Sequence, residues 1–275
     1  MDKVILFAGC SFTAMKDSWA RQLAFKWRNQ YKSQIIAKHG ASNDFIARSI
    51  VYEISRQLDL GTPVTHVFVM WSGPSRHEIM LDKNIFSKPN PNTGEISSYR
   101  RQGDWGEQPK EHALDFAWIK SGGMYEGYKN RKTSEIDVEN KMLDNYFENY
   151  YKVNSDLYFN FKSLESFHYT QIYCKANNIE LINLTYRDII SPMHEIISPS
   201  LVTDDESSVH SYAYLYKAID WDNWYFYNDF GGLREWTISN TNKWEDGYDN
   251  HPHKEAHAEY IRYFLKTNVL NRGTL

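Results

Sequence analysis

Three short apolar runs alternate with amphipathic stretches through the first 72 residues of the chain. Residues 4–8 form one such run, and the segments QIIAKHG and THVFVMW contain the other two, each of the length of a buried strand. Between them, apolar residues recur at helical spacing over residues 17–27 and along SNDFIARSIVYEISRQL, where Ser42 or Asn43 is the expected N-cap. This order predicts a parallel sheet with right-handed crossovers.

The rest of the chain continues the pattern with two interruptions. A helical region is predicted over residues 138–177, a fourth strand in IELINLTY, and a final amphipathic helix in HPHKEAHAEYIRYFLKTNVL. Residues 77–135 and 187–248 lack a clear period and are too long for ordinary loops, so we expect two irregular insertions. The predicted fold is a single α/β domain over residues 1–275, a three-layer sandwich of flavodoxin-like type with a central parallel sheet.

Composition narrows the class of protein. With 41% hydrophobic residues and a net charge of -4, the chain has enough apolar residues for a core and no basic excess, so a nucleic-acid partner is not expected. The two cysteines, Cys10 and Cys174, do not make a disulfide framework, which favours a reducing compartment. No leader and no run of about 20 apolar residues is evident. We therefore expect a soluble, cytoplasmic protein that has no membrane association.

Aromatic residues are unusually frequent, at 16% of the chain. They are densest in WDNWYFYNDF, at residues 221–230 of the second insertion. Such a cluster can stack on sugar rings, form a core, or make an interface with a second copy or another protein. A core or an interface is the favoured interpretation, and sugar stacking remains an alternative.

Candidate catalytic residues follow the predicted strands. In a parallel sheet, functional groups gather at the carboxyl ends of the strands. Ser11 follows the first strand, Gly40 the second, and His251 precedes the last helix, close to Asp249. These are the residue types of a serine nucleophile, its base and a carboxylate that orients the base, while the N–H groups of Ser11 and Gly40 suit an oxyanion.

Three segments together resemble the SGNH (GDSL-type) hydrolases: FAGCSFT after the first strand, GASN after the second and DNHP before the last helix. The resemblance implies that Ser11 is the nucleophile and one oxyanion donor, Gly40 the second donor and His251 the base. The short form of the first segment, with GASN and WSGPSR, is also similar to compact SGNH-like proteins of bacteriophages. That likeness implies a location in the host cytoplasm or in a virion.

Two segments depart from the family pattern. WSGPSR follows the third strand, where the family has an asparagine that donates to the oxyanion, and Asn43 or the Ser72 hydroxyl is the expected replacement. Asp249 lies two residues before His251 instead of three, and Asp246 is a second candidate for the acid. Arg76, in the same segment as Ser72, either holds an anionic group at the mouth of the site or pairs with a nearby acid.

Simpler interpretations exist for these residues. Ser11 alone is also a good helix cap, and His251 and Asp249 are also typical of a helix start. His253 and His257 are one turn apart, as two metal ligands would be, but no third ligand is evident, so neither a metal nor another cofactor is expected.

The sequence therefore leads to two functional hypotheses. The first is a serine esterase of SGNH type that acts on a small acyl ester, for which a carbohydrate O-acetyl group is one candidate. The second is a non-catalytic SGNH-like binding or structural module, such as a phage virion component, with a homo-oligomer or virion contact through the aromatic insertion.

Overall fold

The computed structural model describes residues 3–82, 116–120, 141–196, 207–242 and 251–265. In chain order its elements are β1 (Val4–Gly9), α1 (Ser11–Ala14), α2 (Trp19–Trp27), β2 (Lys32–Ala37), α3 (Asn43–Asp59), β3 (Val64–Trp71), β4 (Glu78–Asp82), β5 (Phe116–Lys120), α5 (Lys141–Val153), α6 (Asp156–Ala176), β6 (Glu180–Thr185), α7 (Ser191–Ile196), α8 (Ser207–Ala218), the 3₁₀ helix η4 (Trp221–Asn223), β7 (Trp224–Tyr225), α9 (Leu233–Asn240) and α10 (Lys254–Phe264). These elements make a mixed α/β fold, as the sequence predicts.

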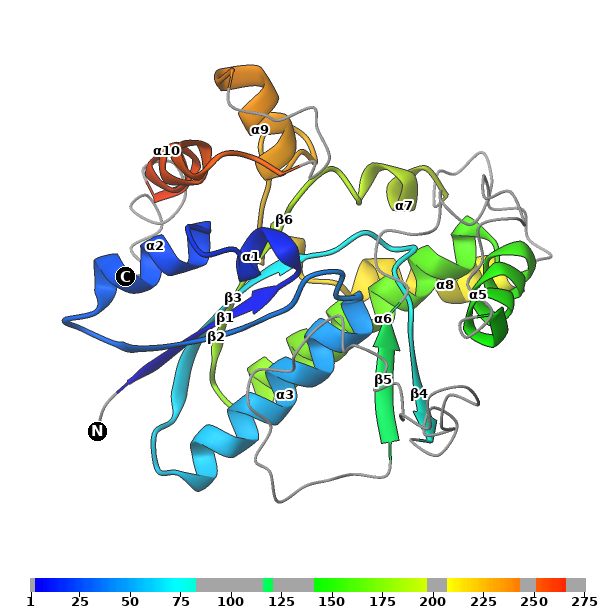
Figure 1. The fold of residues 1–275 in the computed structure, drawn as a ribbon, viewed down its shortest axis with the longest axis horizontal. Coiled ribbons are helices and arrows are strands. Elements are labelled where there is room, and N and C mark those ends of the chain that lie inside the picture. Colours follow the sequence, from blue (N-terminus) through cyan, green and yellow to red (C-terminus); the bar gives the residue numbers. More distant parts are fainter. Residues whose placement is uncertain (1–2, 83–115, 121–140, 197–206, 243–250, 266–275) are drawn as a thin grey trace, which may run out of the picture.

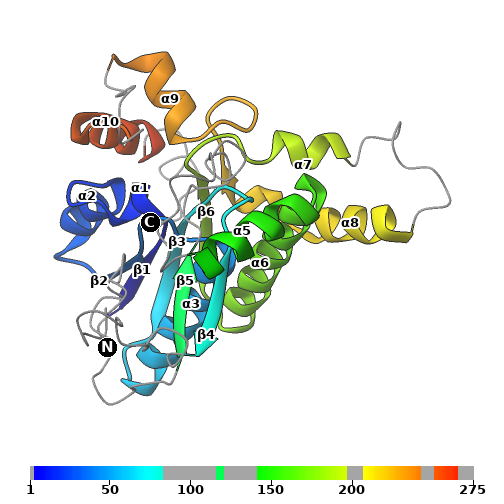
Figure 2. The same ribbon diagram turned by 45° about the vertical axis from the view of Figure 1, so that its right-hand side comes forward.

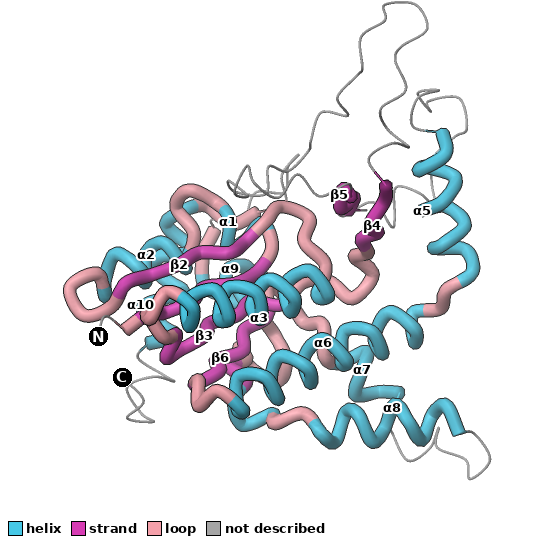
Figure 3. The backbone as a smooth tube through the Cα atoms, turned by 90° about the horizontal axis from the view of Figure 1, so that it is seen from below, coloured by secondary structure: helices cyan, strands magenta, loops and turns pink. Residues whose placement is uncertain are grey.

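The centre of the fold is a five-stranded, all-parallel sheet with the order β2-β1-β3-β6-β7. Helices α2 and α10 lie together over one face of the sheet, and α3 and α6 lie together over the other (Figures 1 and 3). Figure 2 shows α9 next to α10 and α7 and α8 beyond the β6 side of the sheet. The arrangement is a three-layer α/β sandwich, so the predicted fold class is confirmed.

Burial explains why the apolar runs became strands. Every residue of β1 is buried, and β3 is buried over its last five residues. A strand covered by helices on both faces is expected to read as such a continuous apolar run. The flanking helices begin at serine caps, since Ser18 accepts a hydrogen bond from the N–H of Arg21 in α2 and Ser42 accepts one from Phe45 in α3.

The second half of the chain is more regular than its sequence indicates. The predicted helical region is two helices, because Ser155 caps α6 directly after α5 ends. Within residues 187–248, where an irregular insertion is expected, the described part contains α7, α8, η4, β7 and α9, and β7 pairs with β6 as the edge of the central sheet. Within residues 77–135, β4 and β5 form a separate antiparallel pair.

The aromatic cluster belongs largely to the main core. Trp224 and Tyr225 are each 5% exposed, while Trp221, Phe226 and Tyr227 are partly buried and pack against the same core. Trp224 stacks on Trp71 of β3 with ring centroids 6.5 Å apart. These aromatics therefore attach β7 to the sheet, which confirms the core interpretation.

No helix in the described part of the chain is long and apolar enough to cross a membrane.

Candidate active site

The carboxyl ends of the first strands meet at one edge of the sheet. Gly9, the last residue of β1, pairs with Ala37 of β2 and with Met70 of β3, and Trp71 pairs with Thr185 of β6. In the sheet, β2 lies on one side of β1 and β3 lies on the other, so the direction of the strand order reverses between β1 and β3. This position is a topological switch point. Ligands of open α/β sheets bind at such points.

Ser11 lies two residues beyond this edge, as the first residue of the short helix α1. It is only 5% exposed. Its hydroxyl does not cap a helix, since Cys10 is the N-cap residue of α1 and Ser18 is the cap of α2. Gly9 makes the tight turn possible, because a Cβ atom there would lie 2.9 Å from the Met70 carbonyl oxygen and still closer to Thr13.

The Ser11 hydroxyl is hydrogen-bonded to a histidine from the other end of the sequence. Its Oγ atom lies 2.7 Å from Nε2 of His251, three residues before α10 begins. The His251 ring also packs on Phe12, with ring centroids 4.7 Å apart, which restricts its orientation. The structure thus brings the predicted nucleophile and base into hydrogen-bond contact, the geometry that a base needs to take the serine proton.

Ser11 and Gly40, which follow β1 and β2, carry the two backbone N–H groups that are predicted to bind an oxyanion. As the first residue of α1, Ser11 has an N–H group with no partner inside the helix. Gly40 follows β2 with a φ of +70°, a left-handed conformation that glycine adopts without strain. The neighbouring Lys38 donates its N–H to the Gly9 carbonyl at 3.1 Å, which holds the Gly40 turn against the end of β1.

Asn43 is occupied in holding two loops together. Its Nδ2 donates to the Ser72 carbonyl at 3.1 Å and to the Ser163 hydroxyl at 3.0 Å, and its Oδ1 accepts from the Ser72 N–H at 2.8 Å. Both amide hydrogens are therefore used, and Asn43 acts here as a structural link between α3 and the end of β3. The Ser72 hydroxyl, in contrast, is buried and has no hydrogen-bond partner in the described part of the chain. Of the two proposed replacements for the family asparagine, Ser72 is the one with a free donor.

Asp249, the predicted orienter of His251, and the alternative Asp246 lie outside the described residues. Their relation to the histidine ring stays a prediction.

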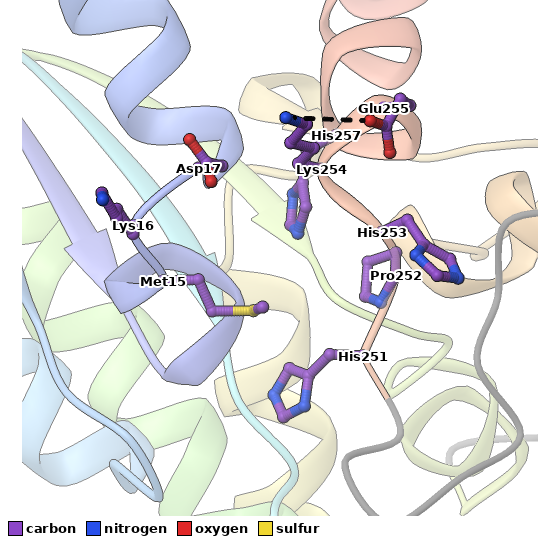
Figure 4. Close-up of a pocket in the computed structure, with 9 residues that line it drawn as sticks. All are labelled: Met15, Lys16, Asp17, His251, Pro252, His253, Lys254, Glu255 and His257. Carbon is purple, nitrogen blue, oxygen red and sulfur yellow. Dashed lines mark ion pairs between the residues drawn. The ribbon is translucent and has the colours of Figure 1, made fainter.

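A cavity of about 430 Å³ adjoins the pair on its α10 side (Figure 4). Its lining residues come from the α1–α2 connection and from the start of α10: Met15, Lys16, Asp17, His251, Pro252, His253, Lys254, Glu255 and His257. Ser11 is not among them, so the cavity reaches the pair from the His251 side. No group of three or more histidine, cysteine, aspartate or glutamate residues placed to hold a metal occurs in the described ranges.

His257 is a structural histidine of this region. It is 1% exposed, and its Nδ1 accepts a hydrogen bond from the Trp19 N–H at 3.3 Å. Burial, with His251 nearby, lowers the pKa of His257 to about 4. Protonation of Nδ1 would also place its N–H group against the Trp19 N–H group, so the folded protein requires the neutral His257 ring.

We predict that acid destabilises the protein through this residue. The pKa of His257 is about 6.5 in the unfolded chain and about 4 in the folded protein. The neutral ring therefore contributes its full stability above about pH 6.5, and this contribution is lost as the pH falls to 4. Between pH 7 and 4 the wild type should lose about 3 kcal/mol more unfolding free energy than a His257→Asn variant, which keeps an acceptor for Trp19. Urea unfolding at both pH values measures this, with His253→Asn as the control; equal losses in wild type and His257→Asn would contradict it.

Two further residues at the same edge are not among the candidates predicted from the sequence. Tyr186 and Arg187 directly follow β6, and the Tyr186 ring packs on Phe12 with centroids 4.9 Å apart. Arg76 contacts the same ring, with its Cζ 5.7 Å from the ring centroid. The rule that strand ends carry functional groups, applied to IELINLTY as it was to the first three strands, would have found them.

The fold and the site together define a class: a three-layer α/β sandwich with a partly buried serine–histidine pair at the carboxyl edge of its parallel sheet. No family model matches the chain, and no curated protein matches it in sequence.

Proposed function

We propose that the protein is a serine ester hydrolase of SGNH type. The single observation that carries the proposal is the 2.7 Å contact between Ser11 Oγ and His251 Nε2 at the carboxyl edge of the sheet. A serine hydroxyl becomes a useful nucleophile when a base lies within hydrogen-bond reach. The order of FAGCSFT, GASN and DNHP along the chain supports the same class by resemblance.

In this mechanism, Ser11 Oγ attacks the ester carbonyl carbon while His251 Nε2, in the tautomer with its hydrogen on Nδ1, accepts the hydroxyl proton. The carbonyl π electrons move to the oxygen, which the N–H groups of Ser11 and Gly40 and the Ser72 hydroxyl would stabilise. Collapse of this intermediate breaks the bond to the alcohol, which leaves with the proton from His251. Water then attacks the acyl-enzyme by the same route and releases the acid and free Ser11.

The proposed substrate is a small acyl ester, with an O-acetyl group on a carbohydrate as one candidate. A cavity of about 430 Å³ next to His251 suits a short acyl or alcohol group better than a long lipid chain. No nucleic acid and no cofactor take part in the proposed reaction.

A second candidate function is a non-catalytic binding or structural module built on the same fold, such as a virion component. The observation in its favour is that Asn43, the only asparagine in the GASN segment, uses both amide hydrogens inside the protein. Removal of one oxyanion donor costs about 100- to 1,000-fold in rate, so a site with two backbone donors alone would be a poor catalyst. Under this hypothesis the pocket binds its ligand and does not cleave it.

Rapid mixing with 4-nitrophenyl acetate distinguishes the two functions. An esterase that forms an acyl-enzyme releases a burst of about one nitrophenolate per chain before the steady state whenever deacylation is slower than acylation. We expect such a burst, or a steady-state rate well above that of Ser11→Ala. Release no faster than that of the Ser11→Ala variant would favour the binding module.

A further inference from the structure

Arg76 carries a charge that the described part of the protein does not neutralise. Its Nη1 atom is buried and has no hydrogen-bond partner, and no carboxylate lies within ion-pair distance in the described ranges. A guanidinium group stays protonated at any ordinary pH, and leaving one of its nitrogen atoms buried without an acceptor is costly. Such an arrangement is typical of a site whose anion comes from outside the chain.

A second arginine faces the same ring. The Arg187 Cζ atom lies 5.3 Å from the centroid of Tyr186, which therefore contacts both guanidinium groups. Each cation gains a modest attraction from the ring, but the two positive charges repel each other. An anion bound close to both would offset that repulsion.

Three acidic residues near the arginines in the sequence or in the fold have other partners, and the first of them, Glu78, is ion-paired with Arg48. Asp188 accepts hydrogen bonds from the N–H groups of Ile190 and Ser191 and from the Ser191 hydroxyl, which hold the start of α7. Glu235 accepts from the N–H groups of Gly232 and Asp188 at the start of α9. None of these three carboxylates lies within ion-pair distance of Arg76 or Arg187.

The arginines lie close to the serine–histidine pair. Phe12 packs on both the Tyr186 ring and the His251 ring, so a single aromatic side chain connects Tyr186 to the base. A Cβ atom on Gly73 would lie 3.1 Å from the Tyr186 hydroxyl and 3.8 Å from an Arg187 nitrogen, which places both next to the loop that carries the Ser72 hydroxyl.

The loop that carries Arg76 is held in place. The Arg76 N–H donates to the Gly73 carbonyl at 3.2 Å, and the Tyr151 hydroxyl of α5 donates to the Ser75 carbonyl at 2.8 Å. The Ser72 N–H is held by Asn43. A charged group on such a preorganised loop loses little conformational freedom when it binds an anion.

We propose that Arg76 and Arg187 bind an anionic oxygen group of the substrate, a carboxylate or a phosphate, beside the ester that Ser11 attacks. This inference rests on the proposed function and adds to it the substrate class: an ester with a negative charge on its acyl or alcohol part. The two planar guanidinium groups suit paired oxygen acceptors.

Two measurements test the anion site, one that needs catalysis and one that does not. The first compares kcat/KM for 4-nitrophenyl acetate with that for the mono-4-nitrophenyl ester of succinic acid, which has the same leaving group and an added carboxylate. Wild type should prefer the anionic ester, and Arg76→Gln or Arg187→Gln should lower that preference about ten- to a hundredfold, as expected for loss of a hydrogen bond to a charged group. The control is Arg28→Gln, because Arg28 also faces an aromatic ring, Phe25, but at the end of α2.

The second measurement is calorimetric titration of the Ser11→Ala protein with monomethyl succinate and, separately, with inorganic phosphate at constant ionic strength. We expect at least one of the two to bind, and the tighter one identifies the anion. Binding should fall about ten- to a hundredfold when Arg76→Gln is added. Absence of binding by both anions, or binding unchanged by the arginine substitutions, would overturn the anion site. Arginine-dependent binding without hydrolysis in the wild type would instead refute the esterase and leave the anion site standing.

Discussion

Replacement of Ser11 by alanine should lower kcat for ester hydrolysis about 10⁴-fold or more, with little change in the fold. In the proposed mechanism the Ser11 Oγ atom is the protein atom that forms the bond to the acyl carbon. Without it, the protein can contribute to the reaction only by binding the substrate and stabilising the oxyanion. The side chain is small and its one described hydrogen bond is to His251, so the protein should stay folded. Steady-state rates with 4-nitrophenyl acetate and circular dichroism of the same samples measure both effects.

Ser33 provides a matched control for this substitution. It lies near the amino end of β2, and its hydroxyl has no hydrogen-bond partner among the described residues. Ser33→Ala should therefore retain wild-type kcat. Similar rates for Ser11→Ala and wild type would show that any hydrolysis occurs elsewhere on the protein.

The second large effect is expected for His251→Gln. Glutamine can keep a hydrogen bond to Ser11, but its amide cannot take up a proton at neutral pH, so acylation loses its general base. Because serine and histidine act as one unit, the loss in kcat should be of the same order as that of Ser11→Ala, and the double variant should be no slower than either single variant.

His168→Gln is the control for His251. His168 lies on α6, on the other side of the sheet from α10, and its Nδ1 has no hydrogen-bond partner in the described part of the chain. It should retain full activity. If the losses from Ser11→Ala and His251→Gln multiplied in the double variant, the two side chains would act independently, contrary to the mechanism.

Much of the fold could be predicted because the central strands are buried on both faces. The segments that form β1, β3 and β6 can be recognised as strands from their apolar composition alone. Ser42, one of the two expected caps, is the N-cap residue of α3. The strand β7 has only two residues, which are too few to show a periodic pattern in the sequence. It forms because the backbone of β6 has a free edge to pair with and the aromatic side chains of β7 pack into the core. The break between α5 and α6 was missed although Ser155 is a good cap, since no proline or glycine accompanies it.

The candidate site was predictable where it depends on strand order and less so where it depends on side-chain partners. The rule that strand ends converge was enough to bring Ser11 and Gly40 to one edge, and His251 was a candidate from its place before the last helix, which the resemblance supported. No sequence pattern indicates that the Asn43 amide would be used by Ser72, 29 residues further along the chain. Arg187 was missed because its importance depends on the missing acid partner and on the shared contact with Tyr186, both of which are tertiary features.

The most direct test of the central claim, that Ser11 and His251 form a nucleophile–base pair, is labelling with a fluorophosphonate probe followed by peptide mass spectrometry. Such a probe forms a covalent bond with a serine that a neighbouring base has activated. We expect one label per chain, located on Ser11 and absent in His251→Gln. A wild-type protein that remains unlabelled at Ser11 under conditions that label a known serine esterase would contradict the claim.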